Sequence, residues 1–354
     1  MKLFFAGGFQ GQIELGLKQL AENRSLAPIL VPIRNFAWMA VAVRNRLKPQ
    51  KPYRAPIPVI SVGNITVGGT GKTPFVKWIV RRLMETGCRP AILTPLSESA
   101  DEVKELSAEN LSMSVSCPIF PGRDRVKNVK RAIECGATVI VLDDGFQYRS
   151  LHRDVDILLW DATSFLSSCN LFLREPLTSL RRATCIVVSK ADALDDEGQE
   201  KLKQQIEKWA GQGKVIAAFG YEPAEVRSLE SGKFSESDNF RPSKVMLVSG
   251  IANPRYFFMT AQRAGFNVVA MVCFPDHHRY NLSDAKFISE LAKAEGISAV
   301  LTTKKDAIKL KGLWHDEIPL FVLEVKLRWV WGEERLWEMV ENLAHCKVRC
   351  PPLR

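Results

Sequence analysis

The strongest constraint on this chain is residues 58–74, which read Pro-Val-Ile-Ser-Val-Gly-Asn-Ile-Thr-Val-Gly-Gly-Thr-Gly-Lys-Thr-Pro. The apolar start predicts a buried strand over residues 58–62, and the end predicts a helix that begins near Thr73. Between the two, glycines let the backbone bend around a phosphate with its N–H groups pointing inward. A helix N-terminus and Lys72 both favour negative charge at the same point. This order of strand, loop and helix predicts a nucleotide-binding α/β core.

The loop departs from the strict phosphate-binding pattern at its first position, where Thr66 stands in place of glycine. The alternative is a glycine-rich turn that binds no ligand, although Gly-Lys-Thr arrives in the required place between strand and helix. We expect eight consecutive residues to surround the nucleotide phosphates, and the last of them to offer its hydroxyl to magnesium: Thr66, Val67, Gly68, Gly69, Thr70, Gly71, Lys72 and Thr73.

A second expected strand ends on two carboxylates. Residues 138–144 read Thr-Val-Ile-Val-Leu-Asp-Asp, with Asp143 and Asp144 at the carboxyl end of an apolar run. Open α/β sheets bind their ligands at that end of the strands, and one carboxylate there would hold a phosphate-bound magnesium ion. The two side chains point to opposite sides if the backbone stays extended, which predicts different roles. The alternative is a turn-forming Asp-Asp-Gly sequence.

Length and charge limit the organisation and the partners. The chain has 354 residues, which is enough for two domains with separate cores. A net charge of +10 suits phosphate-rich partners, whether nucleic acid, anionic lipid or nucleotide. Eight scattered cysteines are typical of a protein from a reducing compartment. The first ten residues lack the long apolar run and cleavage site of a secretory signal.

Residues 26–47 are apolar but interrupted by Pro28, Pro32 and Arg34, so they do not predict a spanning helix of about 20 apolar residues. From Ile33 onward, aromatic and aliphatic residues precede a basic cluster. This arrangement fits a helix that lies in an anionic membrane surface. The alternative is a helix packed on the protein's own core.

The rest of the chain alternates expected strands and helices, which predicts parallel sheets. We expect an α/β protein with a P-loop NTPase-like parallel sheet core, a second, smaller α/β domain and an N-terminal interfacial helix. The expected parts are a membrane-associated helical segment (1–50), the P-loop core (51–221), a polar linker or hairpin (222–243) and a C-terminal α/β domain (244–354).

Two more loops that follow expected strands carry polar side chains. The first, Ser189-Lys-Ala-Asp192, is similar to the N-K-x-D sequence with which GTP-binding proteins read the base; a plain loop is the alternative. The second, residues 274–280, reads Phe-Pro-Asp-His-His-Arg-Tyr and holds two of the chain's five histidines. An orienting or acid/base role for His277 or His278 competes with a simple exposed loop.

Six motifs in this order together resemble the tetraacyldisaccharide 4′-kinase (lipid A 4′-kinase) family over nearly the whole chain, from about residue 26. They are residues 62–74, 142–147 (Leu-Asp-Asp-Gly-Phe-Gln), 173–182 (Leu-Arg-Glu-Pro-Leu-Thr-Ser-Leu-Arg-Arg), 250–254 (Gly-Ile-Ala-Asn-Pro), 274–278 and 301–306 (Leu-Thr-Thr-Lys-Lys-Asp). The resemblance implies a P-loop kinase that transfers the γ-phosphate of ATP to the 4′-hydroxyl of tetraacyldisaccharide 1-phosphate and forms lipid IVA.

The resemblance also implies the surroundings of such a kinase. ATP and Mg2+ would be its cofactors, and the disaccharide 1-phosphate lipid and the membrane surface its partners. It would lie on the cytoplasmic face of the inner membrane, and residues 26–47 would be its interfacial anchor. No nucleic acid and no obligate protein partner are implied.

Individual residues take roles from the same resemblance. Asp143 and Asp144 match an Asp-Asp pair that binds magnesium together with Thr73, with the choice between the two carboxylates left open. Lys72 and Asp144 would act on the phosphate in catalysis.

On the acceptor side, Asp101 aligns with the aspartate of the family's Gly-Asp-Glu sequence and His277 with the histidine of its Asp-His sequence. The implied dyad uses the aspartate to take the hydroxyl proton and the histidine to orient it. The chain departs from the family at residues 94–100, where Thr-Pro-Leu-Ser-Glu-Ser-Ala replaces an Arg-Gly-Tyr-Gly stretch.

Two other functions compete with the lipid kinase. A partition-type ATPase or GTPase switch would hydrolyse nucleotide without a lipid acceptor, but partition ATPases usually carry a lysine where this chain has Val67. A non-catalytic member of the family is the second alternative, suggested by the altered loop before Asp101.

Overall fold

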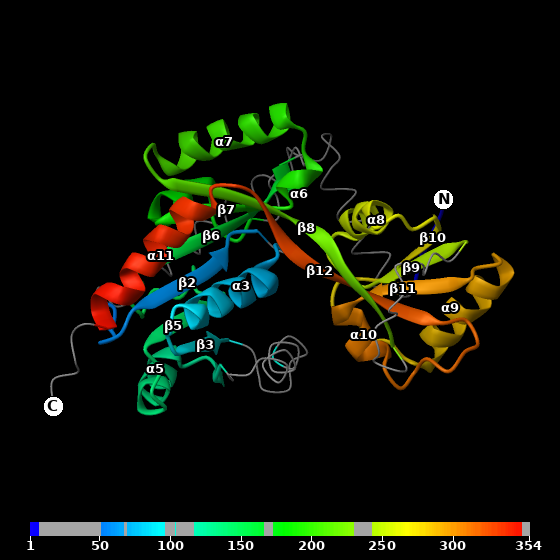
Figure 1. Cartoon of the computed structure of the whole chain (residues 1–354), viewed down its shortest axis with the longest axis horizontal. Coiled ribbons are helices and arrows are strands. Elements are labelled where there is room, and N and C mark those ends of the chain that lie inside the picture. The colour runs from blue at the N-terminus through cyan, green and yellow to red at the C-terminus, as the bar shows by residue number, and fades with distance from the viewer. Residues whose placement is uncertain are drawn as a thin grey trace, which may run out of the picture. The chain divides into compact units, whose positions relative to one another are not determined.

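The computed structural model describes residues 1–6, 51–66, 69–95, 103, 117–165, 173–229 and 243–348. The chain divides into two compact units, each of which is an α/β structure (Figure 1). The phosphate-loop unit comprises Arg24–Gly220 and Trp329–Arg354, and the second unit comprises Met1–Asn23 and Tyr221–Arg328. Among the described helices, none combines the length and the apolar character that a membrane crossing requires.

The phosphate-loop unit is built on parallel strands whose residues are mostly buried. Their order is β8 (Val215–Ser228), β7 (Cys185–Ser189), β6 (Val155–Asp161), β2 (Val59–Asn64), β5 (Val139–Asp143), β3 (Pro90–Thr94) and β4 (Ile119–Pro121). Every residue of β2, β3, β5, β6 and β7 is buried. Strands covered on both faces read as continuous apolar runs, which is why the sequence pattern located β2 and β5.

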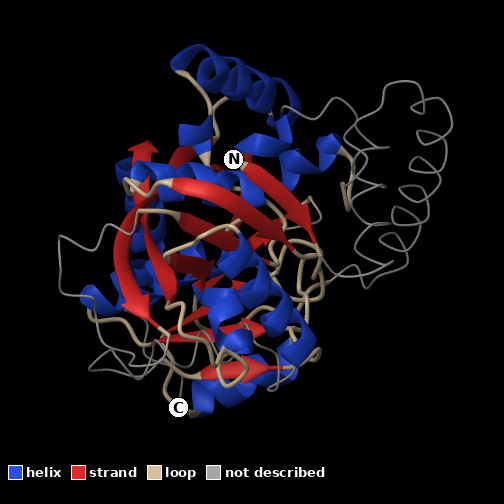
Figure 2. Cartoon of the chain, turned by 90° about the vertical axis from the view of Figure 1, so that its right-hand side faces the viewer, coloured by secondary structure: helices blue, strands red, loops and turns tan. Residues whose placement is uncertain are grey.

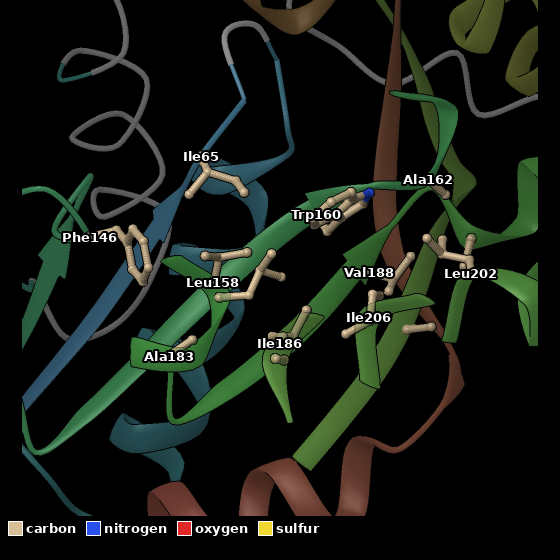
Figure 3. Close-up of a cluster of buried hydrophobic side chains, with 14 of the residues drawn as sticks. Ile65, Phe146, Leu158, Trp160, Ala162, Ala183, Ile186, Val188, Leu202 and Ile206 are labelled. Atoms are coloured by element: carbon tan, nitrogen blue, oxygen red, sulfur yellow. The ribbon is translucent and has the colours of Figure 1, made fainter. Parts of the chain in front are cut away.

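Helices cover both faces of these strands. On one face, α5 (Arg125–Glu134) and α7 (Asp196–Ala210) pack on alternate strand residues, such as Ile186 and Val188 beneath Leu202 of α7 (Figure 3). On the other face lie α3 (Lys72–Glu85) and α11 (Glu333–Val348), where Phe75 stacks on Phe219 with ring centroids 5.7 Å apart. Short elements complete the unit: α6 (Ala162–Phe165), η2 (Leu177–Arg182) and η3 (Ala191–Ala193).

The second unit repeats the same principle on a smaller scale. Its parallel strands are ordered β1 (Lys2–Phe5), β10 (Val268–Cys273), β9 (Val245–Ser249), β11 (Ala299–Thr303) and β12 (Leu320–Trp331). One set of alternate residues, including Val248, packs with α9 (Leu282–Ala294) and α10 (Lys304–Leu310); the other set, including Leu247, packs with α8 (Pro254–Arg263). Figure 2 shows helices flanking strands in this way.

The expected fold class is confirmed, because both units carry parallel strands between helices. The expected boundary of a C-terminal domain at residues 244–354 is wrong in one respect: α11 belongs to the phosphate-loop unit. Its Trp337 ring lies 6.0 Å from Trp78 of α3, and Leu336 and Val340 are fully buried. Since β12 continues to Trp331, the chain leaves the second unit and delivers the last helix to the first core.

Two other expected segments differ. Of the expected linker or hairpin at residues 222–243, residues 222–228 form the end of β8, whose charged side chains pair with those of β12, as in Glu222 with Lys326 at 3.0 Å. Partial exposure of this strand gave it the polarity of a loop. Residues 230–242 lie outside the described residues. At the N-terminus, residues 2–5 form β1 beside β10 rather than part of a helical segment. The expected interfacial helix at residues 26–47 lies outside the described residues.

Candidate active site

The phosphate loop leaves the carboxyl end of β2 and enters α3. Gly71, the residue before the helix, has a φ of 80°, in the left-handed region that suits glycine best. Asn64, the last residue of β2, donates from its amide to the Thr66 carbonyl and to the Thr70 hydroxyl, both at 2.9 Å. The loop is therefore held from its inner side by the strand that precedes it. Val67 and Gly68 lie outside the described residues.

The two carboxylates stand beside this loop because β5 is the hydrogen-bonded neighbour of β2, with Asp143 opposite Val62. Asp143 is the last strand residue, but Asp144 already has a φ of 49°, so the extended geometry that would send them to opposite sides does not persist. The turn folds back onto β2, since the Gly145 amide donates to the Val62 carbonyl at 3.0 Å.

Asp144 is surrounded by cations. Lys72 of the phosphate loop lies 3.4 Å from its carboxylate, and Arg174 donates to the two carboxylate oxygens at 3.2 and 3.1 Å. Arg125, which is 3% exposed, donates two hydrogen bonds of 3.2 Å to the Asp144 carbonyl. Burial opposes the charge of Asp144, but Lys72 and Arg174 outweigh it, and the pKa of this carboxyl falls below its usual value.

Asp143 has a different environment. Burial raises its pKa, and the nearby Lys72 only partly offsets that effect. One carboxylate oxygen accepts a hydrogen bond from the Thr94 hydroxyl at 3.1 Å. The other, Oδ1, is buried and has no hydrogen-bond partner among the described residues. A buried carboxylate oxygen without a donor is a suitable ligand for a hard cation.

Magnesium would find few ligands from the protein itself. The described residues contain no group of three or more His, Cys, Asp or Glu side chains arranged to hold a metal ion. Mg2+ is commonly bound by one or two carboxylates together with phosphate oxygens and water. The free oxygen of Asp143 and the hydroxyl of Thr73, in the first turn of α3, fit that mode.

Arg174 owes its position to a buried network around the segment that carries it. Glu175, which is 2% exposed, accepts from Arg182 at 2.7 Å and from Ser179 at 2.9 Å. The Arg182 guanidinium lies 4.3 Å from the centre of the Phe146 ring, in the loop that follows β5. This network fixes residues 173–182 against the loop of the two carboxylates.

In the second unit, His277 lies in the loop after β10 with a φ of 63°. Its amide donates to the Gly250 carbonyl at 3.2 Å, and its ring Nε2 lies 3.4 Å from the Lys305 ammonium. Asp306 is fully buried and accepts a hydrogen bond from the Gly250 amide at 3.0 Å. It therefore fixes the residue to which the His277 loop is bonded.

His278 is occupied structurally. Its Nε2 lies 2.9 Å from the Asp284 carboxylate, which also accepts from the Asn281 amide at the start of α9. Its ring stacks on Phe274 with centroids 4.6 Å apart. The side chain of His277, by contrast, is 60% exposed. Of the two histidines, His277 has the more exposed side chain.

The structure therefore brings Lys72, Asp143 and Asp144 together at the end of β2 and β5, with the described part of the phosphate loop. His277 lies in the other unit, and Asp101 lies outside the described residues, so their pairing stays a prediction. Sequence reasoning did not assign Arg174 or Arg125 to the site. Arg174 lies inside the quoted motif at residues 173–182, but its partner Asp144 is distant in sequence.

A protein family and the relatives reported below share one description. Residues 26–95 and 98–345 match the family described as tetraacyldisaccharide-1-P 4′-kinase. A tetraacyldisaccharide 4′-kinase of Halothermothrix orenii is 32% identical over 339 residues, covering 84% of this chain and 87% of that protein. The tetraacyldisaccharide 4′-kinase of Bdellovibrio bacteriovorus is 29% identical over 341 residues, covering 89% of this chain and 98% of that protein.

Among solved structures, LpxK from Aquifex aeolicus in complex with ATP aligns with a TM-score of 0.64 and 26% identity. The alignment covers 90% of this chain and 99% of that one. The family match spans both units, including the segments that carry Lys72, Asp144 and His277. This chain belongs to the tetraacyldisaccharide-1-P 4′-kinase family.

Proposed function

We propose that this protein phosphorylates the 4′-hydroxyl of tetraacyldisaccharide 1-phosphate with ATP and so forms lipid IVA. The observation that carries the proposal is the family match over residues 26–95 and 98–345, on a chain that retains charged groups for the donor, with Lys72 3.4 Å from Asp144. In the reaction, the hydroxyl oxygen bonds to the γ-phosphorus, the bond to the ADP oxygen breaks, and the hydroxyl proton passes to a base.

The donor side depends on charge placed in advance. When the γ-phosphate binds, the Lys72 ammonium contacts it, either in place of Asp144 or while still paired with Asp144. The Arg174 guanidinium keeps Asp144 ionised and in place. Phosphoryl transfer needs positioning and stabilisation of charge more than covalent chemistry from the protein. Amides and cations fixed before the substrate arrives avoid reorganisation during the reaction.

Magnesium is proposed to be held by Asp143 and Thr73 with the nucleotide phosphates, and it would neutralise charge on the transferring group. The buried oxygen of Asp143 that lacks a hydrogen-bond donor among the described residues supports this assignment over Asp144. Asp144 is already paired with Lys72 and Arg174, which lowers its availability.

On the acceptor side, we infer that Asp101 takes the proton of the sugar hydroxyl and that His277 orients the reacting groups. The exposure of His277 and the structural occupation of His278 support the choice between the two histidines. Lys305 helps to position the His277 ring, because its ammonium lies 3.4 Å from Nε2. Residues 26–47 are proposed to anchor the protein in the membrane surface where its lipid resides.

The test is a transfer assay with labelled ATP, magnesium and the disaccharide 1-phosphate lipid in mixed micelles. We expect label in the lipid, at the 4′ position, and far less label in a parallel reaction with Lys72→Ala protein. ATP binding without any labelled lipid would reject the kinase and favour the non-catalytic member. ATP hydrolysis that is independent of lipid would favour the switch-type ATPase.

A further inference from the structure

Lys190 reaches the phosphate loop from a strand two positions away in the sheet. It follows β7 directly, and its side chain is only 7% exposed. Its ammonium donates to the Gly69 carbonyl at 2.8 Å and also pairs with the carboxylate of Asp161, the last residue of β6. A buried ammonium is tolerated only when charge and hydrogen bonds compensate for lost water, so these contacts define where the side chain sits.

The partners of Lys190 are themselves fixed. Asp161 accepts from the amide and the hydroxyl of Thr163, at 2.9 and 2.6 Å, at the start of α6. Its neighbours Trp160 and Ala162 are anchored in the buried cluster of β6, β7 and α7 (Figure 3). Lys190 also has a φ of 56°, which is unfavourable for a residue with a β carbon. Such backbone geometry persists where surrounding contacts impose it, often at functional sites.

The contact with Gly69 sets the direction of a peptide group. In a trans peptide the C=O and the following N–H point in opposite directions. A Gly69 carbonyl drawn toward Lys190 therefore turns the Thr70 amide the other way. Asn64 fixes the Thr70 side chain from β2. The loop is thus held by side chains from the ends of two strands. Among the described residues, Lys190 is the one whose side chain bonds to the peptide group between Gly69 and Thr70, and it fixes the orientation of that group.

We propose that Lys190 is a positioning residue for the phosphate loop, which holds the Gly69–Thr70 peptide in the orientation that binds the triphosphate of the nucleotide. The motif at residues 189–192 then serves the phosphates and not the base, although its sequence is similar to a base-reading motif. This inference rests on the proposed use of ATP as the donor.

The experiment compares the affinities of three lysine variants for ATP and for inorganic tripolyphosphate by titration calorimetry with magnesium. Lys190→Met should weaken both ligands by about the same factor, tenfold or more, because a hydrogen bond from a charged donor is lost. Lys190→Arg should recover most of the loss. The double variant Lys190→Met with Asp161→Asn keeps the site free of an unpaired buried charge, and it should show the same weak binding with a thermal stability near the wild type.

Lys214→Met is the matched control. Lys214 also caps backbone carbonyls of the phosphate-loop unit, those of Arg181 and Ala183, but not the loop itself. Its loss should leave both affinities unchanged. In the transfer assay, Lys190→Met should raise the KM for ATP and leave the KM for the lipid unchanged.

Two outcomes would overturn the inference. Weakened ATP binding with unchanged tripolyphosphate binding would mean that Lys190 acts on the nucleoside. Unchanged affinity for both ligands in Lys190→Met and in the double variant would mean that the contact has no role in binding. Failure of the wild type to bind either ligand would instead reject the proposed use of ATP, and the inference with it.

Discussion

In both units, polar or charged residues follow the carboxyl ends of parallel strands, but the two units differ in how far partners enclose these side chains. In the phosphate-loop unit, Asp144 and Lys190 are enclosed by partners: Asp144 by two cations, and Lys190 by a carboxylate and a carbonyl. In the second unit, His277 is 60% exposed and contacts Lys305 at 3.4 Å. The strand ends of the first unit are organised before any ligand arrives.

Both units have a non-glycine residue with positive φ in a loop after a parallel strand. Three non-glycine residues of the described chain have positive φ, namely Asp144, Lys190 and His277, and each follows the end of a parallel strand. Unfavourable backbone geometry at strand ends is typical of sites where function imposes a side-chain direction. Both units hold such a position, and the one on the donor side is preorganised by its ion pairs and hydrogen bonds.

The largest effect expected from this comparison is on Lys72. Lys72→Ala should lower kcat/KM by about a hundred- to a thousandfold, because a cation next to the transferring phosphate is lost. Thermal unfolding should change little. Arg81→Ala, an exposed change on the same helix, is the control. A Lys72 variant with near-normal turnover would show that the enclosed strand end of the first unit is not the donor site.

The next effect separates the two histidines. His277→Ala should lower kcat by about a hundredfold through loss of an orienting group, with the melting temperature nearly unchanged. His278→Ala should do the reverse: it should cost about 1 kcal/mol of stability through its lost contact with Asp284, and leave turnover mostly intact. Turnover and thermal melting of both variants measure the contrast. The opposite pattern would transfer the proposed role to His278.

The smallest expected effect concerns Asp143 and stability. Burial raises its pKa, so the contribution of this carboxyl to folding is complete at acid pH and is lost as pH rises through the raised pKa. Asp143→Asn should therefore be more stable than the wild type at neutral pH, on the order of 1 kcal/mol, while losing activity. The two proteins should converge below the usual aspartate pKa of 3.8.

Melting curves at several pH values without magnesium test this prediction. A wild type that is more stable than Asp143→Asn at neutral pH would mean that the charge is stabilised by contacts other than those described. Added magnesium should narrow the difference, because a bound cation compensates for the buried charge.

Part of the architecture was readable because its signals are local. Apolar runs covered on both faces located β2 and β5, and Gly-Lys-Thr located the start of α3. The strand in residues 222–228 escaped notice because an exposed strand has the polarity of a loop. The assignment of α11 to the first unit escaped for another reason: helical periodicity reveals an apolar face but not the core that covers it.

The candidate site divides in the same way. The phosphate loop, the Asp-Asp pair and the histidine loop could be read from the sequence, because each is a run of adjacent residues whose chemistry is recognisable without its partners. The contacts among these groups came from the fold: Arg174 and Lys72 share Asp144, His278 pairs with Asp284, and Lys190 reaches Gly69 across 121 positions of sequence. These are contacts between strand ends, and strand ends become neighbours only when the order of strands in the sheet is established.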